Sequence, residues 1–297
     1  MARQYLRKAR AILTGGGGKI TINPSDVVED VELRISFQIQ KDLAGQANTM
    51  EVSLYNLAEG TRNSVGKEWD TIELEAGYIP PGESGNVGTI YKGAIRDAFS
   101  HRQRGDVITE ISCGDGDLAF RRSTINKTFP KGTSVQTVVD ELYAQMEKDG
   151  IDRGEWKFPD GMKEFKRPYT ACGSCTRELD RLGKSNDFYW SSQNQTLEIV
   201  PGDGYLAGLV LITPETGLIG VPTITDNGVR AKALLNPEIR PGRRVQIESE
   251  TLEMNAEGGI YRVSSATYAG DNHQGDFVVD IGGESIQGGK VDEGAKK

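Results

Sequence analysis

The sequence predicts a mainly β protein with an α+β insert, in which two β-barrel domains flank a small α/β domain. Apolar and polar residues alternate with a strand's period of two on both sides of a central stretch whose apolar spacing is helical. The 297 residues include 37 glycines, which indicates many turns between short strands. We place the domains at residues 1–112, 113–205 and 206–297.

The first region consists almost entirely of predicted strands. The clearest is VELRISFQIQ, residues 31–40, where five apolar side chains share one face: Val31, Leu33, Ile35, Phe37 and Ile39. The same alternation recurs in MEVSLYNL, TIELEAGY and VITEIS, with glycine-rich and proline-rich joints between strands. Closely spaced strands with one apolar face predict a barrel or a sandwich.

The second region contains the strongest helix signal. Thr133 is the predicted N-cap, with Gln136 three residues later as in a capping box, and apolar residues follow at helical spacing. A shorter helix is predicted after Ser174, ending at Gly183. FYWSSQNQTLEIVP then predicts a hairpin whose turn lies near residues 193–195.

Strands return in the third region, from about residue 206. Proline fixes its own φ and restricts the residue before it, so Asn236-Pro237 and Pro241-Gly242 predict turns. The strand RRVQIES that follows places Val245 and Ile247 on one buried face. Further strands are predicted at GLVLITP, GVRAKALL, GIYRVSSATYAG and DFVVDIGG. The C-terminal tail SIQGGKVDEGAKK is rich in glycine and charge, and we expect it to be flexible.

Charge and composition argue against several functional classes. The formal net charge is −8, which gives no support for nonspecific binding to nucleic-acid phosphate. The basic N-terminal stretch MARQYLRKARAIL has too short an apolar run for a signal peptide, and no segment approaches the ~20 apolar residues of a membrane span. We expect a soluble protein made in a cytoplasm, with this stretch exposed and without an assigned role. Three cysteines argue against a disulfide framework.

Cys172 and Cys175 have the C-x-x-C spacing of zinc and redox sites. A structural zinc needs four ligands, and besides this pair the chain offers only Cys113, His101 and His273. The surrounding RPYTACGSC indicates a loop entering a helix rather than a thioredoxin-like βαβ unit. We therefore predict no metal and no cofactor, and keep the two cysteines as a minor candidate.

Other glycine-rich motifs predict turns. GGGGK, residues 15–19, precedes a strand and not the helix N-terminus that a phosphate loop needs, so a hairpin tip is favoured. CGDGD and PGDG lack the ligand spacing of an EF-hand and lie at the predicted domain joints. The two histidines occur in no nucleophile-elbow or HExxH pattern, so no catalytic residue is predicted.

Motifs in all three regions resemble those of phage tail baseplate hub proteins. In the third region they are GLIG-P, DNGV, LLNP, a PG before an arginine-rich strand, YRV and a GD pair. The second region contributes SCGDGDLAFRRSTINKTFPKGTSVQTVVDEL and RELDRLGKSNDFYWSSQNQTLEIV, and the first contributes SFQIQKDLAGQANTMEVSLYNLAEGTR. The order of these motifs, from about residue 30 onward, carries the resemblance.

The resemblance implies a homotrimeric hub of the virion, assembled in the host cytoplasm. In that family two barrels per subunit form a pseudo-sixfold ring, which joins the hexameric tail tube to the trimeric central spike. The hub part of type VI secretion spike proteins has a related architecture. The implied partners are the tail tube, spike, tape-measure and other baseplate proteins, with DNA only in transit and no membrane span.

Such an adaptor needs surfaces rather than a pocket, and Arg240, Arg243 and Arg244 are the interface candidates. They surround the turn before RRVQIES, where they would meet acidic groups of a neighbouring chain or of their own sheet. A solvated turn is the alternative, because charges on turns are commonly hydrated. If the ring lumen is acidic, as the net charge permits, DNA would pass through without binding.

Two other functions remain open. A carbohydrate-binding adhesin would need exposed aromatic platforms, for which Trp156, Tyr189 and Trp190 are candidates, although we expect all three in the core of the second region. A tail-associated cell-wall-degrading enzyme would need a further catalytic domain, and the three predicted regions leave no residues for one.

Overall fold

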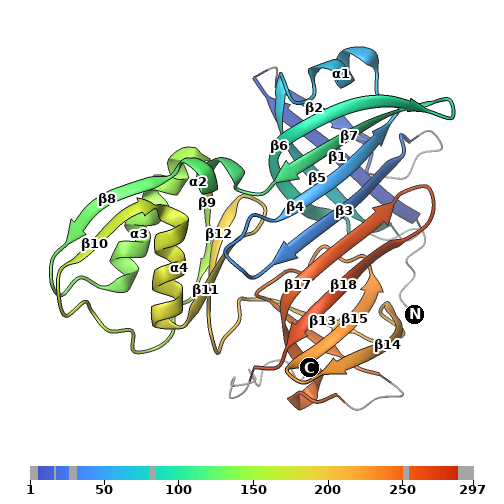
Figure 1. The fold of residues 1–297 in the computed structure, drawn as a ribbon. Coiled ribbons are helices and arrows are strands. Elements are labelled where there is room, and N and C mark those ends of the chain that lie inside the picture. Colours follow the sequence, from blue (N-terminus) through green and yellow to red (C-terminus); the bar gives the residue numbers. More distant parts are fainter. Residues whose placement is uncertain (1–5, 17, 27–31, 80–84, 250–253, 287–297) are drawn as a thin grey trace.

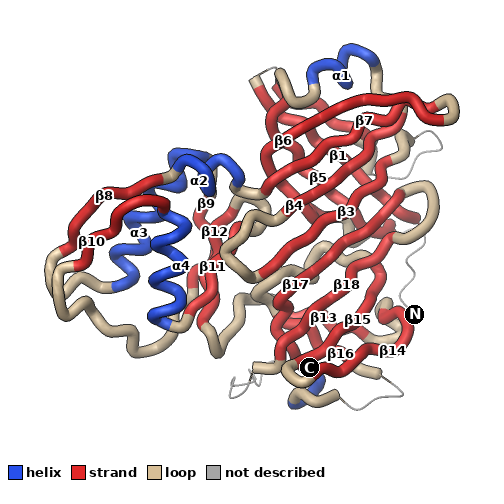
Figure 2. Tube along the Cα trace, in the orientation of Figure 1, coloured by secondary structure: helices blue, strands red, loops and turns tan. Residues whose placement is uncertain are grey.

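The structure is a computed structural model that describes residues 6–16, 18–26, 32–79, 85–249 and 254–286. It is β-rich, as predicted, with a separate group of helices on one side (Figures 1 and 2). We call residues 6–114 and 209–284, which carry the large sheet, the β body, and residues 117–201, which carry most of the helices, the helical lobe.

The β body contains one 13-stranded sheet. Its main path is β14-β15-β18-β17-β3-β4-β7-β6-β5-β1-β2, with β16 paired to β17 and β13 paired to β16. The strands before the lobe are β1 (Leu6–Gly15), β2 (Gly18–Ile22), β3 (Ile35–Asp42), β4 (Thr49–Tyr55), β5 (Trp69–Ile79), β6 (Gly88–Gln103) and β7 (Asp106–Gly114), with the short helix α1 (Glu59–Ser64). Those after it are β13 (Leu209–Ile212), β14 (Leu218–Thr225), β15 (Gly228–Leu234), β16 (Arg244–Ile247), β17 (Ile260–Asp271) and β18 (Phe277–Glu284), with the 3₁₀ turn η2 (Glu257–Gly259).

The prediction of two closed β-barrels is corrected by this pairing. Within the described residues the strands form a single open sheet, which passes from the first region into the third where β3 pairs with β17. The join is possible because β17 is long: Ile260–Arg262 pair with β16, and Ser265–Asp271 pair with β3 along the same edge. Alternation of apolar residues identified the strands but could not indicate which strands are neighbours.

Two four-strand blocks of the sheet have the same connectivity. In block one the spatial order is β3-β4-β7-β6, and in block two it is β14-β15-β18-β17. In both, the first two strands along the chain are neighbours, the third lies at the far side, and the fourth returns between the second and the third. Each third strand also has a register shift against its neighbour, between Ile95 and Asp97 in β6 and between Val263 and Ser265 in β17. The two regions are therefore structural copies in this part of the sheet.

One apolar core serves the whole β body, and it contains the predicted inward residues of both regions, Val245 and Ile247 among them. The strand predicted from residue 31 begins at Ile35, and Val31 lies outside the described residues. The described part of the N-terminal basic stretch is not a free exposed segment, because Leu6–Gly15 form β1 and Lys8 is fully buried; residues 1–5 lie outside the described residues. The GGGG segment is a hairpin tip as predicted, with Gly15 opposite Gly18.

The helical lobe has its own apolar cluster, built by α3 (Val135–Met146) and α4 (Cys175–Asn186) against the hairpin of β11 (Phe188–Ser192) and β12 (Thr196–Pro201). The remaining elements are α2 (Asp117–Arg122), β8 (Thr124–Phe129), β9 (Asp152–Trp156), β10 (Tyr169–Ser174) and the 3₁₀ turn η1 (Glu147–Asp149). β8 pairs with β10, and β9 pairs with β12. The predicted hairpin turn at residues 193–195 is confirmed.

Two helix boundaries differ from prediction. Ser134, not Thr133, is the N-cap of α3, because its hydroxyl accepts a hydrogen bond from the Thr137 amide at 3.1 Å. Helix α4 continues past Gly183 and ends at Asn186, with Asp187 as its C-cap in a left-handed conformation. Gly183 is instead a packing residue: a Cβ there would lie 2.6 Å from the Phe188 carbonyl oxygen. The C-terminal tail from residue 287 lies outside the described residues.

Candidate functional site

The structure offers surfaces rather than a deep cleft. The cavities described have volumes of about 320 to 460 Å³ and open onto solvent. The described residues contain no group of three or more His, Cys, Asp and Glu side chains placed to hold a metal. They also contain no helix with the length and apolar character needed to cross a membrane.

The two cysteines of the C-x-x-C motif have different environments. Cys172 is exposed on β10, while Cys175 is buried at the start of α4. Burial, reinforced by the nearby Asp149 carboxylate, raises the pKa of the Cys175 thiol to about 11, and burial raises that of Cys113 to about 12. A thiol of such high pKa is a poor nucleophile and a poor metal ligand at neutral pH.

This difference predicts selective thiol labelling. With iodoacetamide at neutral pH we expect one cysteine of the folded chain, Cys172, to react quickly, and the two buried cysteines to react only after unfolding. Mass spectrometry of the labelled chain measures the count, and Cys172→Ser provides the control that should remain unlabelled. Rapid labelling of Cys175 in the folded chain would contradict the assigned burial.

The aromatic candidates for sugar binding are mostly core residues. Trp190 is 3% exposed and donates its indole hydrogen bond to Asp180 at 2.9 Å, and Trp156 donates to the Leu197 carbonyl at 2.9 Å. Tyr189 differs from our expectation, because it is 44% exposed and lies 5.0 Å from the Arg262 guanidinium. A single exposed ring beside an arginine is not a stacking platform.

The three interface candidates have different surroundings. Arg243 forms a two-pronged ion pair with Glu198 of the lobe, at 3.0 and 3.2 Å. Arg244 stacks over the Tyr205 ring at 4.0 Å. Burial and the neighbouring Arg243 lower the pKa of Arg240, whose Nε is buried and lacks a hydrogen-bond partner in the described structure. A role for these arginines between subunits stays a prediction, but Arg243 already joins lobe to body.

The lobe is fastened to the β body by a second, fully buried polar cluster around Asp115. This residue follows β7 and has no exposed surface. Its carboxylate accepts hydrogen bonds from the Ser192 hydroxyl at 2.7 Å and from the backbone amides of Asn194 and Gln195 at 2.7 and 2.6 Å. The turn of the β11–β12 hairpin thus wraps around one carboxylate of the body.

Lys41 supplies the opposite charge in this cluster. It is 1% exposed and donates to the Asn194 side-chain oxygen at 2.5 Å. Burial lowers the pKa of Lys41 to about 8 despite the Asp115 carboxylate, and burial raises the pKa of Asp115. Sequence reasoning missed both residues, although Lys41 continues the apolar face of β3 (Ile35, Phe37, Ile39), and a lysine at that position signals a buried partner.

The Lys41 pKa predicts a pH dependence of stability. The unfolded chain, where lysine titrates near its ordinary 10.5, binds more protons than the folded chain between about pH 8 and 10.5. The contribution of this group to the free energy of unfolding therefore rises as pH increases through that window and is lost as pH falls to 8. We expect Lys41→Met to remove this slope in urea unfolding at pH 7.5 to 10 (about the range of that window). An unchanged slope would contradict the assignment.

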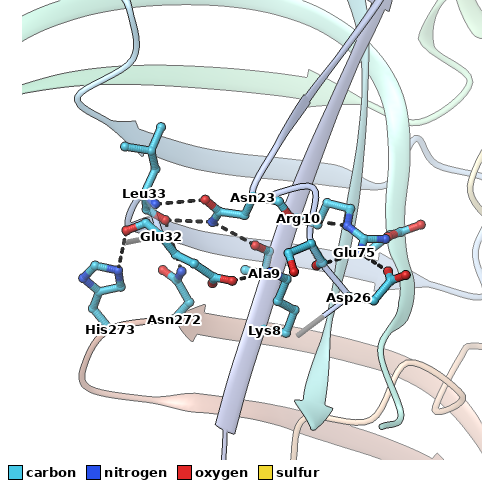
Figure 3. A network of polar contacts seen from close by, with 11 residues as sticks. Lys8, Ala9, Arg10, Asn23, Asp26, Glu32, Leu33, Glu75, Asn272 and His273 are labelled. Carbon is cyan, nitrogen blue, oxygen red and sulfur yellow. Dashed lines mark hydrogen bonds and ion pairs between the residues drawn. The ribbon is translucent and has the colours of Figure 1, made fainter. Parts of the chain in front are cut away.

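Side chains, rather than a strand ladder, hold the segment before β3 against β1 (Figure 3). The Asn23 amide donates to the carbonyls of Ala9 and Leu33 at 3.1 and 2.8 Å, and its oxygen accepts the Leu33 amide at 2.9 Å. Lys8 forms a buried ion pair with Glu32. The Asn272 amide donates to the same Leu33 carbonyl at 3.1 Å. We call these residues, Lys8, Ala9, Asn23, Glu32, Leu33 and Asn272, the seam.

The outward side of the sheet's centre is polar and carries no basic residue. We define this polar face by the side chains that alternate with the core on β17, β3, β4 and β7: Ser265, Thr267, Ala269, Ser36, Gln38, Gln40, Asp42, Thr49, Glu51, Ser53, Glu110 and Ser112. They lie in cross-strand rows, such as Thr267 opposite Gln40 and Gln40 opposite Thr49. Three are acidic and none is Lys or Arg.

Basic residues begin only at the borders of the polar face. Arg34 stacks over Tyr55 at 4.5 Å at one end, and Arg230 and Lys232 lie on β15 beyond β18. A surface of hydroxyls, amides and carboxylates offers no site for phosphate, because phosphate recognition depends on cations and aligned N–H donors. Chemically, this face suits contact with water or with a polyanion that must not bind.

Comparisons with known proteins find a matching family and solved structures of similar fold. Residues 17–283 match the family model described as Baseplate hub gp41. A search of the curated proteins finds no match. Among solved structures, the fold is similar to the 43 kDa tail protein of prophage MuSo2 from Shewanella oneidensis, with a TM-score of 0.60, 10% identity, and coverage of 94% of this chain and 98% of that one.

Two further structures share the fold. The tail protein from Neisseria meningitidis MC58 has a TM-score of 0.58 and 10% identity, with 95% of this chain and 97% of that chain covered. An Escherichia coli component of the type VI secretion system, described as structurally similar to the bacteriophage T4 tail proteins gp27 and gp5, has a TM-score of 0.58 and 9% identity, with 87% and 76% covered.

Proposed function

The chain belongs to the Baseplate hub gp41 family of structural phage tail proteins, and we propose that three copies of it close into a hub ring. The ring would join the hexameric tail tube to the trimeric central spike and give passage to DNA and the tape-measure protein. The observation that carries the proposal is the duplicated four-strand block, because two equivalent blocks in each of three subunits form six similar units around one axis.

The domain division at residues 1–112, 113–205 and 206–297 fits this role. We assign the first and third domains to the ring wall and the helical lobe, in the second, to contacts with other baseplate proteins. Spike association is supported by similarity to a chain of the Francisella PdpA–VgrG complex, with a TM-score of 0.57, 6% identity, and coverage of 95% of this chain and 58% of that one. The tail location follows from the family. We propose that the hub is assembled in the host cytoplasm and that the chain has no enzymatic activity.

The polar face is our candidate for the channel wall. In a ring built from sheets, one side of each sheet must face the passage, and the polar face, with three carboxylates and no cation, would repel DNA phosphates there. Arg230 and Lys232 lie on the same side of the sheet, on β15 beyond the border of the polar face. The duplex would then slide through without a bound state. The apolar side cannot serve, because it is the core of the β body.

Adding positive charge to the polar face should create DNA binding. We expect Gln38→Lys with Glu51→Lys, which are cross-strand neighbours, to bind a short DNA duplex about tenfold more tightly than the unmodified protein at low salt, with the gain lost as salt rises. Fluorescence anisotropy measures the affinity. Gln136→Lys with Glu164→Lys makes the same charge change on exposed positions of the lobe and is the matched control.

If the lobe variant binds DNA as tightly as the face variant, net charge rather than location explains the effect. That outcome would remove the polar face as the channel wall.

The mass of the assembly tests the ring itself. Sedimentation of the purified chain, alone and with the tube and spike proteins of the same tail, should show a species of three times the 32.4 kDa chain. The trimer should bind the spike protein. A chain that stays monomeric in every mixture, or one that forms twofold dimers, would refute the hub ring.

A further inference from the structure

Besides the outer edges of the short strands β2 and β13, two longer strand edges of the β body have no strand partner in the described structure. The first is the second half of β6, because β5 pairs with β6 only over Gly88–Ala94 and leaves Asp97–Gln103 open on that side. The second is the outer edge of β14, whose only paired neighbour is β15. Both edges carry exposed apolar side chains: Phe99 is 55% exposed, and on β14 Val221 is 63% and Ile219 37% exposed. The unpaired N–H and C=O groups of such an edge are a template for pairing with a strand of another chain.

The duplication makes these two edges equivalent to edges that are paired inside the chain. By connectivity, β6 corresponds to β17, and β14 corresponds to β3. The two blocks also correspond residue by residue. In each block the first cross-strand row after the register shift runs through all four strands and fixes the alignment. In block one this row is Gln38, Glu51, Ser112 and Asp97. In block two it is Thr223, Arg230, Gly282 and Ser265.

The β17–β3 junction therefore serves as a template. The first half of β6 pairs with β5, and the first half of β17 pairs with β16, in each case on the edge that faces away from the block. The second half of β17 then pairs with β3, antiparallel, whereas the second half of β6 has no strand partner on this edge among the described residues. In the template Gln40 lies opposite Thr267 and Gln38 opposite Ala269.

We propose that residues Asp97–Gln103 of β6 pair antiparallel with β14 of the next copy of this chain, in the register that β17 and β3 use. The proposal rests on the hub ring above and names the strands that close it. Carrying the register across places Phe99 opposite Thr225 and His101 opposite Thr223 of the next copy. At the end of β14 the Thr225 carbonyl accepts a hydrogen bond from Asn255 at 3.1 Å, so the Thr223–His101 position is the clearer of the two.

The pairing explains how the ring closes. Since β6 of one copy meets β14 of the next, the contact is heterologous, and a heterologous contact closes when the rotation between copies divides a full turn. Strand directions alternate along β14-β15-β18-β17-β3-β4-β7-β6, so a following β14 continues the antiparallel order. Three copies with eight such strands each would form one continuous wall of 24 strands, with the polar faces on one side and Arg230 and Lys232 of each β15 on that same side.

Cysteine cross-linking tests the register. In a Cys172→Ser background, we expect the double variant His101→Cys with Thr223→Cys to form covalent dimers and trimers on mild oxidation, because directly opposite residues place their Cβ atoms within disulfide reach. The mismatched pair Phe99→Cys with Thr223→Cys, two residues out of register, should give on the order of tenfold less cross-linked chain. Non-reducing electrophoresis measures both, and circular dichroism verifies that the variants are folded.

Single-cysteine chains separate the possible outcomes. His101→Cys alone and Thr223→Cys alone should not cross-link, whereas their mixture should give dimers only. Cross-linking of His101→Cys with itself would indicate a twofold contact and overturn the pairing. A chain that sediments as a trimer but does not cross-link at the matched pair would overturn the pairing and leave the hub ring standing. A chain that stays monomeric with its tail partners would overturn both.

Discussion

Replacing Asp115 by alanine is expected to lower the free energy of unfolding by about 3 to 5 kcal/mol, the cost of breaking a buried charge cluster by removing one partner. The carboxylate has no exposed surface, and its loss leaves two backbone amides of the hairpin turn, Asn194 and Gln195, without an acceptor. It also leaves Lys41 buried without its nearest compensating charge. Urea unfolding monitored by tryptophan fluorescence measures the change.

Two variants bracket this prediction. Asp115→Asn keeps the size and one acceptor oxygen, so we expect a smaller loss. Asp160→Ala removes an exposed carboxylate of the lobe and should change the free energy of unfolding by less than about 0.5 kcal/mol. An Asp115→Ala loss below about 1 kcal/mol would mean that the hairpin turn does not depend on this residue.

Replacing Asn23 by alanine is expected to cost about 3 kcal/mol, because three hydrogen bonds across the seam disappear. The buried Ala9 carbonyl and the part-buried Leu33 amide lose this partner, whereas the Leu33 carbonyl keeps its hydrogen bond from Asn272. Part of the loss comes from the backbone, since Asn23 has a φ of 56°, a region that alanine avoids. Thermal and urea unfolding measure the effect.

Glycine separates the two causes. Asn23→Gly tolerates the positive φ, so the loss that remains in this variant belongs to the side-chain hydrogen bonds. Asn56 provides a matched site, with the same φ of 56° but an exposed side chain, and Asn56→Ala should cost about 1 kcal/mol. If Asn23→Ala costs no more than Asn56→Ala, the seam does not depend on its side-chain bridge.

Local patterns in the sequence predicted much of the fold. The alternation of Ile35, Phe37 and Ile39 identified the buried face of β3, and Val245 and Ile247 did the same for β16, because a period of two needs no knowledge of the neighbouring strands. The helix α3 and the turn of the β11–β12 hairpin were also predicted from local patterns, namely helical spacing and turn residues. Helix boundaries were less accurate, since Gly183 was taken for a stop when packing against Phe188 requires it.

Long-range pairing could not be predicted in this way. The join of β3 to β17 links residues more than 220 positions apart, and no local signal marks it. The same holds for Asp115, whose partners lie in a hairpin about 80 residues later, so the CGDGD motif was interpreted as a turn alone. The sequence did contain one usable signal, a lysine at an inward position: Lys41 continues the apolar face of β3 and marks a buried polar cluster.

The structural duplication favours the open strand edges over the three predicted arginines as the contact between copies. Arg243 pairs with Glu198 of the lobe and so stabilises the contact between lobe and body within one subunit, while Arg244 stacks on Tyr205 of the segment that connects the two. The open edges of β6 and β14 are better placed for contact between copies, because the chain already pairs their structural equivalents. A polar outward face and an apolar inner face then give the sheet two separate roles, one toward the passage and one toward the core.

A reconstruction of the assembled tail tip by electron cryomicroscopy would show both the number of copies and the order of their strands. We expect three copies around the tail axis, a continuous sheet in which β6 of each copy adjoins β14 of the next, and Gln38, Gln40 and Glu51 lining the passage. Copies in any other number, or a polar face turned outward while basic residues line the channel, would contradict the account.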